Sequence, residues 1–145
     1  MKIIVINGPN LNLLGMREPE LYGKEDYAAL EKLIHETCES ESIEVDIFQT
    51  NHEGAIVDKI QQSLGQYDGI IINPAAYTHT SIAILDALKA VGLTAVEVHI
   101  SDITRREQFR QTSLTSLACV KSIIGEGLDG YRQAILFLKE FLVTF

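Results

Sequence analysis

The sequence of 145 residues has no tryptophan, three prolines and two cysteines. Cys38 and Cys119 stand far apart, in neither a C-x-x-C motif nor a metal-ligand spacing, so we expect both to be ordinary core thiols. Few prolines and 10 glycines, beside 46% hydrophobic residues, exclude a disordered or low-complexity chain. We therefore expect one globular domain spanning residues 1–145.

Long hydrophobic runs are absent as well. No apolar stretch reaches the roughly 20 residues that a membrane-spanning helix needs. The apolar segment 2–6 is too short for a signal peptide, and no small-residue cleavage pattern follows it. We expect a cytoplasmic enzyme or binding domain with no membrane partner.

Positive charge is scarce. Lysine and arginine number 12 against 20 acidic residues, which gives a formal net charge of −8. Nucleic acids and anionic membranes both require a basic surface, so we expect neither as a partner. An anionic small molecule would need a locally positive site.

The sequence does contain short apolar runs that alternate with segments of helical period. Predicted strands lie at 2–7, 43–49, 70–73, 94–100 and 117–124. Predicted helices lie at 26–40, 53–64, 80–91 and 130–141. Continuous apolar strands between helices indicate a parallel sheet covered on both faces. The predicted fold class is α/β, a flavodoxin-like doubly wound five-stranded parallel sheet in three α/β/α layers, in which ligands bind beyond the carboxyl ends of the strands.

A loop of about 15 residues follows the first predicted strand, and loops this long in compact domains are usually functional. Its asparagines are closely spaced, its leucines could fold it inward, and Arg17 stands five residues before Tyr22. A plain surface loop with turn-forming Asn and Gly is the alternative. A phosphate-binding loop is excluded, because neither G-x-G-x-x-G nor a G-K-S/T ending is present.

His79 follows the third predicted strand, among hydroxyl residues that could cap the next helix: Thr78, Thr80 and Ser81. It is either a ligand contact or an exposed residue of the first helical turn. Because the site in such a sheet lies just after the strands, we favour the ligand contact.

Glu97 and His99 are two residues apart on a predicted strand, so their side chains share one face. A carboxylate can orient a histidine and stabilise its charged form, as a general acid requires; a purely structural buried pair is the alternative. Arg106 and Arg110 follow at helical i,i+4 spacing. They either face a bound carboxylate together or form a solvated basic stripe.

The residue types in these segments exclude several classes of reaction. The segments hold no Ser-His-Asp or Cys-His arrangement for acyl transfer, no metal-ligand spacing, no dinucleotide fingerprint and no strand-end lysine for a Schiff base. We expect neither a metal nor an organic cofactor. Tyrosine, arginine, histidine and amides remain, which suit acid–base chemistry on a small polar anion. Arg17 would favour ionised Tyr22 and make it a usable base.

Four motifs resemble those of the type II 3-dehydroquinate dehydratases, in the same order over nearly the whole chain. They are G-P-N-L-N-x-L-G-x-R-x-P-x-x-Y at 8–22, N-H-E-G at 51–54, I-N-P-x-A/G-Y-T-H-T-S at 72–81, and E-V-H-x-S with R-E-x-F-R at 97–110. The resemblance implies dehydration of 3-dehydroquinate to 3-dehydroshikimate through an enolate, in the shikimate pathway of aromatic amino acid biosynthesis. It also implies that no metal or Schiff base takes part.

The resemblance also implies roles for five catalytic residues. Tyr22 would abstract the proton at carbon 2 of the substrate, with Arg17 lowering its pKa and stabilising charge in the transition state. Asn10 would help to hold a water against the enolate oxygen. His99 would protonate the departing hydroxyl, with Glu97 orienting it.

The family pattern further implies a set of substrate-binding residues and an assembly. The backbone N–H groups of Ile100 and Ser101 would hold the substrate carboxylate. The side chains of Asn73, His79 and Arg110 would bind the ring hydroxyls, and Arg106 would support the site's charge or the loop. Asp86 would reach a neighbouring subunit's site, since the family forms homododecamers built from trimers.

The sequence also departs from the family pattern at several positions. Asp102 replaces the usual Asn, and its charge should weaken binding of an anion unless Arg106 or Arg110 neutralises it. The usual H-S-Y element reads T-S-L at 112–114, G-F-G reads G-E-G at 125–127, and Lys121 replaces an uncharged residue. We expect these changes to affect subunit packing and affinity more than the reaction.

Two rival functions remain. One is a flavodoxin-like binding module without turnover, against which Tyr22, Arg17 and His99 count. A phosphorylated regulatory domain is excluded, because Asn7 and Asn73 stand where acidic residues are needed. The other rival is an enzyme that acts on a related cyclitol acid such as quinate.

Overall fold

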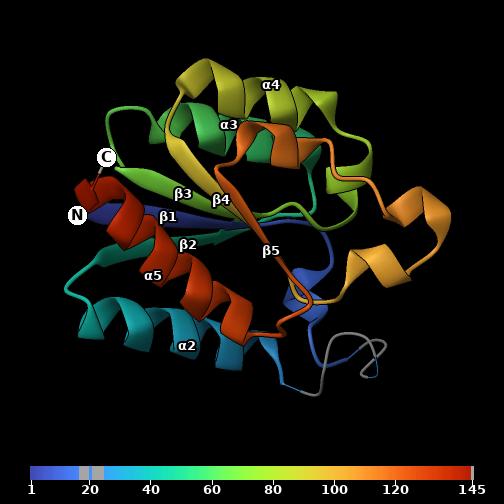
Figure 1. Cartoon of the computed structure of the whole chain (residues 1–145), viewed down its shortest axis with the longest axis horizontal. Coiled ribbons are helices and arrows are strands. Elements are labelled where there is room, and N and C mark those ends of the chain that lie inside the picture. The colour runs from blue at the N-terminus through green and yellow to red at the C-terminus, as the bar shows by residue number, and fades with distance from the viewer. Residues whose placement is uncertain (17–19, 21–24, 145) are drawn as a thin grey trace.

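The computed structural model describes residues 1–16, 20 and 25–144, and within them five strands form one parallel sheet in the order β2-β1-β3-β4-β5 (Figure 1). The strands are β1 (Lys2–Asn7), β2 (Glu44–Gln49), β3 (Gly69–Asn73), β4 (Thr94–His99) and β5 (Lys121–Ile124). The α-helices are α2 (Tyr27–Ser40), α3 (Glu53–Ser63), α4 (Ile82–Val91) and α5 (Asp129–Thr144). This strand order is the flavodoxin-like one, so the predicted fold class is confirmed.

Helices cover both faces of the sheet, with α2 and α5 on one side and α3 and α4 on the other (Figure 1). Successive residues of a strand point to opposite faces. Val5 and Ile71 accordingly belong to the core beneath α2 and α5, whereas Ile6 and Ile72 belong to the core beneath α3 and α4. Burial on both faces explains the continuous apolar runs of these strands. In the described part of the chain, no helix is both long and apolar enough to cross a membrane.

Helix α4 is capped at both ends, and its N-cap is one of the hydroxyl residues that the sequence offered. The Ser81 hydroxyl accepts a hydrogen bond from the Ile84 N–H at 2.9 Å, which makes Ser81 the N-cap. Gly92 lies in the left-handed region, with φ 65°, and its N–H donates to the Leu88 carbonyl. Helix α4 therefore begins directly after the segment of the chain that carries His79.

Gly8 brings the segments after β1 and β3 into contact. Its N–H donates to the Asn73 carbonyl at 2.8 Å. A Cβ at this position would lie 2.5 Å from the Pro74 carbonyl oxygen, so a glycine is required. Leu11 and Leu14 then turn inward and are buried, as expected for a loop that folds onto the protein.

The fifth strand begins later than predicted. It starts at Lys121, because residues 115–118 form a 3-10 turn, η5 (Thr115–Ala118), that leaves Leu117 exposed. The Thr115 hydroxyl donates to the Glu97 carboxylate, and the Ser116 N–H donates to the Ser113 hydroxyl. These side-chain hydrogen bonds favour a turn here over an extended strand. The prediction of a strand from residue 117 was wrong at its start.

Arg106 and Arg110 do not lie on one α-helix. Arg106 has an extended backbone between two 3-10 turns, η3 (Ile103–Arg105) and η4 (Gln108–Arg110). The i,i+4 spacing of the two arginines therefore does not correspond to an α-helix, because Arg106 is itself extended.

Both cysteines are thiols in hydrophobic surroundings. Cys38 is buried in the core beneath α2, and Cys119 is half-buried beside η5. Burial raises the pKa of Cys38 to about 11 and that of Cys119 to about 12. Neither side chain is a thiolate at neutral pH, which agrees with the expectation of core thiols.

Candidate active site

A pocket opens at the carboxyl ends of β1, β3 and β4. Its volume is about 140 Å³, comparable to an engineered apolar cavity of about 150 Å³ that binds benzene. The pocket therefore suits a small ring. Eight of the residues singled out from the sequence line it, namely Asn10, Asn73, His79, His99, Ile100, Ser101, Arg106 and Arg110.

Among the other singled-out residues, one lies elsewhere on the protein and two fall outside the described residues. Asp86 is exposed on α4 and is not among the residues that line the pocket. Arg17 and Tyr22 lie outside the described residues. Their roles, and that of Asp86 toward a neighbouring subunit, stay predictions.

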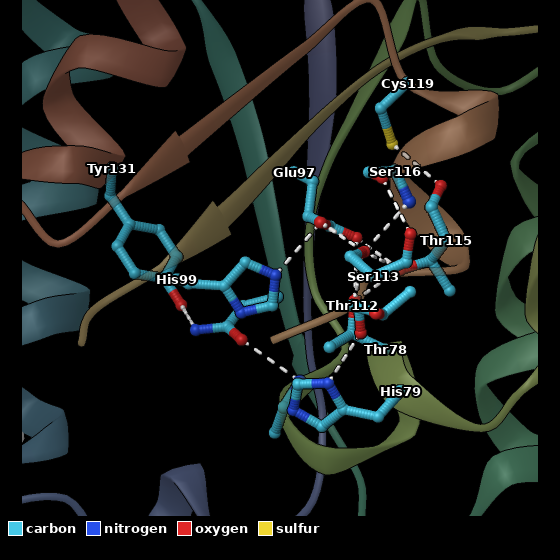
Figure 2. Close-up of polar contacts among 12 residues, drawn as sticks. Thr78, His79, Glu97, His99, Thr112, Ser113, Thr115, Ser116, Cys119 and Tyr131 are labelled. Atoms are coloured by element: carbon cyan, nitrogen blue, oxygen red, sulfur yellow. Dashed lines mark hydrogen bonds and ion pairs between the residues drawn. The ribbon is translucent and has the colours of Figure 1, made fainter. Parts of the chain in front are cut away.

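Glu97 and His99 form a buried pair at the end of β4. Glu97 is 0% exposed and His99 is 4% exposed. The His99 Nε2 lies 2.9 Å from the Glu97 Oε2 (Figure 2). Because Glu97 is behind the pocket wall and His99 lines it, the carboxylate can hold the imidazole in place from behind.

Three hydroxyl groups complete the surroundings of Glu97 (Figure 2). Thr78 and Thr115 donate to Oε1, and Ser113 donates to Oε2 at 2.8 Å. With His99 on Oε2, each carboxylate oxygen accepts two hydrogen bonds. An ionised carboxylate has about four acceptor sites, so this one is saturated.

The hydrogen bonds outweigh the cost of burying Glu97. Burial alone would raise the pKa of its carboxyl group. Hydrogen bonding and charge attraction from His99, with hydrogen bonds from Thr115 and Ser113, lower that pKa below its ordinary value instead. The pair is therefore set up as a carboxylate beside an imidazole, which is the arrangement a general acid needs.

Segment 112–116 contacts the site, although the sequence patterns predicted no site role for it. The Thr112 carbonyl accepts a hydrogen bond from His79 Nδ1 at 2.8 Å, which places the proton on that nitrogen. Ser113 and Thr115 bond Glu97 directly. The expectation that the changes at 112 and 114 mainly affect packing and affinity stays a prediction, because Thr112 contacts His79 through its backbone carbonyl and Ser113 is a serine in the family pattern too. The dense run of hydroxyl residues at 112–116 was the available signal.

Asp102 is not among the residues that line the pocket. Its carboxylate accepts hydrogen bonds from the N–H and hydroxyl of Thr104, which lower its pKa, and forms an ion pair with Arg105 at 3.5 Å. Arg105, at the end of the same 3-10 turn, is an ion-pair partner of this carboxylate, so the charge of Asp102 is partly compensated locally.

The pocket's cationic side is formed by two half-buried arginines. Arg106 and Arg110 both line it, which favours a bound anion over a solvated basic stripe. Arg110 Nε lies at an ion-pair distance of 2.7 Å from Glu107 Oε2, but within the described residues this buried nitrogen makes no hydrogen bond. Among the described residues, no three His, Cys, Asp or Glu side chains are grouped so that they could hold a metal ion.

The fold and site together define an α/β enzyme of the flavodoxin-like class, with a histidine–carboxylate pair and two arginines at the carboxyl edge of the sheet. Comparison with known families makes this specific. The family model described as dehydroquinase class II matches residues 1–139, and the chain belongs to that family.

Relatives and solved structures agree. The chain is 51% identical over 142 residues to the 3-dehydroquinate dehydratase of Carboxydothermus hydrogenoformans, covering 98% of this chain and 92% of that protein. It is 54% identical over 136 residues to that of Campylobacter hominis, covering 94% and 88%. The crystal structure of the type II dehydroquinase from Butyrivibrio crossotus superposes with a TM-score of 0.94 at 54% identity, covering 96% of this chain and 97% of that one.

Proposed function

We propose that the protein is a hydro-lyase that dehydrates 3-dehydroquinate to 3-dehydroshikimate through an enolate, in the shikimate pathway. The observation that carries this proposal is the buried Glu97–His99 pair at a pocket with two arginines, in a chain of the class II dehydroquinase family. The substrate is a small cyclic anion, which agrees with the size and charge of the pocket.

The first half of the reaction removes the proton at carbon 2. Tyr22 is the proposed base, and Arg17 keeps its phenolate form accessible. Negative charge passes to the carbonyl oxygen, where Asn10 holds a water that stabilises it. Asn10 lines the pocket with φ 71°, and its N–H donates to Asn51 Oδ1 at 3.0 Å, which supports a fixed backbone at this position.

The second half expels the hydroxyl at carbon 1 as water. His99 gives its proton to the departing oxygen while the enolate electrons form the new double bond. The Glu97 carboxylate keeps the imidazole oriented toward the substrate. The three hydroxyls around Glu97 support this role, because they stabilise the ionised carboxylate.

The remaining pocket residues would hold the substrate. The backbone N–H groups of Ile100 and Ser101 lie at the end of β4 and bind its carboxylate, while Asn73, His79 and Arg110 bind its hydroxyls. Arg106 adds positive charge at the same wall. The binding energy then fixes the ring between base and acid.

We also propose a cellular and molecular setting. Residues 1–145 act as one catalytic domain without metal or cofactor, in the cytoplasm. Asp86, exposed on α4, contacts the site of a neighbouring subunit in a homododecamer built from trimers. Light scattering of the purified protein tests the assembly, and a smaller particle would contradict it.

Ultraviolet absorbance with 3-dehydroquinate tests the reaction. The conjugated enone of the product should appear, and neither a chelator nor borohydride treatment of the enzyme should reduce its rate of formation. Quinate is the control substrate and should give no enone. No enone from 3-dehydroquinate at high protein concentration would contradict the proposal and favour a binding module, and turnover of quinate alone would favour the rival enzyme.

Tyr22→Phe tests the proposed base. The substitution removes the only ionisable group of that side chain, so turnover should be abolished while the far-ultraviolet circular dichroism and the unfolding midpoint stay unchanged. Activity like that of the wild type would remove Tyr22 from the mechanism.

A further inference from the structure

A buried chain of polar side chains runs behind the pocket. Asn73 Nδ2 donates to the Tyr131 hydroxyl at 2.9 Å, and that hydroxyl donates to Asn7 Oδ1 at 2.7 Å. Asn7 Nδ2 donates in turn to the Tyr27 hydroxyl at 3.2 Å. Tyr131 and Asn7 are 0% exposed and Asn73 is 3% exposed. Asn73 is the member of this chain that lines the pocket, so the other groups can act on a ligand only through it.

Tyr131 belongs to α5, which lies on the far side of the sheet from α4 (Figure 1). The close approach depends on Gly130, whose Cβ would lie 3.3 Å from a Val98 side-chain carbon. The Tyr131 ring fills the core, and burial raises the pKa of its hydroxyl far above the ordinary value. The hydroxyl therefore keeps its proton, and that proton points to Asn7.

The hydrogen bonds define the orientation of the Asn73 carboxamide. Its Oδ1 accepts from the Ala75 N–H at 3.1 Å, and one of its two N–H groups donates to Tyr131. The second N–H of the Asn73 amide and the second lone pair of its Oδ1 remain available to a ligand in the pocket. A half-turn of the amide would set its NH2 group against the Ala75 N–H and would lose both bonds. Tyr131 thus supplies one of the two contacts that hold the amide.

We propose that Tyr131 is a positioning residue that acts through Asn73: its buried hydroxyl holds the Asn73 carboxamide so that an N–H is presented to a hydroxyl of the bound ring. The inference rests on the proposed function, because it assigns a ligand to Asn73. Tyr131 itself does not line the pocket.

Steady-state kinetics of single and double variants test this coupling. Tyr131→Phe removes only the hydroxyl and should lower kcat/KM about five- to tenfold, the size of one net hydrogen bond. In an Asn73→Ala background the same substitution should have no further effect, because its route to the ligand is gone. Tyr27→Phe is the matched control, and its kcat/KM should stay within about twofold of wild type, since Tyr27 bonds Asn7 and not Asn73.

Each contrary result overturns the inference. An unchanged Tyr131→Phe enzyme would show that the hydroxyl does not matter, and an equal loss in the Asn73→Ala background would show that it does not act through Asn73. An equal loss in Tyr27→Phe would place the effect at Asn7.

A nuclear magnetic resonance measurement separates failure of this inference from failure of the proposed function. If the wild-type protein does not turn over 3-dehydroquinate, the proposed function fails, but the Asn73 side-chain NH2 signals can still be compared between wild type and Tyr131→Phe. Shifted signals with faster amide hydrogen exchange would support positioning by Tyr131. Unchanged signals would overturn it, whether or not the enzyme is active.

Discussion

At the scale of single residues, the site depends on the charge of one buried carboxylate. Glu97 has no contact with solvent, yet its pKa is lowered, because hydrogen bonds from His99, Thr115 and Ser113 and the charge of His99 outweigh the effect of burial. Thr115 is one of these donors and is itself buried. Removing a donor from a buried acceptor is costly, so the hydroxyls around Glu97 should matter for the reaction as well as for stability.

Thr115→Val should show this directly. The variant keeps the shape of the side chain but loses the hydroxyl, so the pKa of Glu97 should rise and activity should be lost at a higher pH on the acid side of the profile. We expect kcat near neutral pH to fall about tenfold, in line with a charged hydrogen bond. The pH dependence of kcat is the measurement, and Thr115→Ser, which retains the hydroxyl, is the control. An acid limb identical to that of wild type would contradict this account of Glu97.

A second residue-scale prediction concerns Asp102. Arg105 pairs with its carboxylate at 3.5 Å and is largely exposed, so its effect should be small. Arg105→Ala should raise KM for the anionic substrate about twofold, because the negative charge of Asp102 is then less compensated. Asp102→Asn should cancel that rise. A rise in KM that persists in the double variant would show that Arg105 acts independently of Asp102.

At the scale of elements, the site is assembled by contacts between loops that follow different strands. Gly8 holds the segment after β1 against the turn after β3. The Leu114 N–H donates to the Thr78 carbonyl at 2.7 Å and holds the segment before β5 against the same turn. The segments that follow β1 and β3 and the segment that precedes β5 thus share one set of backbone contacts at the edge of the sheet where the pocket lies.

Gly8→Ala should disrupt this junction. The added Cβ would meet the Pro74 carbonyl oxygen at 2.5 Å, and backbone cannot move aside as a side chain can. We expect the free energy of unfolding to fall by about 2–3 kcal/mol, measured by urea denaturation. Gly54→Ala on α3 is the matched control, since nothing lies within 4 Å of its Cβ, and it should change stability by less than about 1 kcal/mol. Equal effects of the two substitutions would contradict the role of Gly8.

At the scale of the whole molecule, charge links the site to stability. The protein carries a net charge of −8, and several of its carboxyl groups have lowered pKa values in the folded state. Such a group stabilises the fold above its unfolded pKa, and that contribution disappears as the pH falls through the folded pKa. Glu97 should dominate, because Asp129, whose pKa is lowered to about 2 by Arg132 and Gln133, is exposed and screened by solvent.

The free energy of unfolding should therefore fall as the pH decreases from about 4.5, the ordinary value for glutamate, toward 2. Urea denaturation at a series of pH values measures this slope. Glu97→Gln should flatten it, and Asp129→Asn should flatten it less. A slope that Glu97→Gln leaves unchanged would show that Glu97 does not carry the pH dependence.

The sequence by itself determined the elements and their order, because apolar periodicity and helix caps are local properties. It also placed Glu97 and His99 on one face, since the period of a strand is two residues. Only the tertiary structure brought Ser113 and Thr115 onto Glu97 and Tyr131 onto Asn73. These contacts join residues that are distant in the chain, and their formation depends on how the loops and α5 pack rather than on any local pattern.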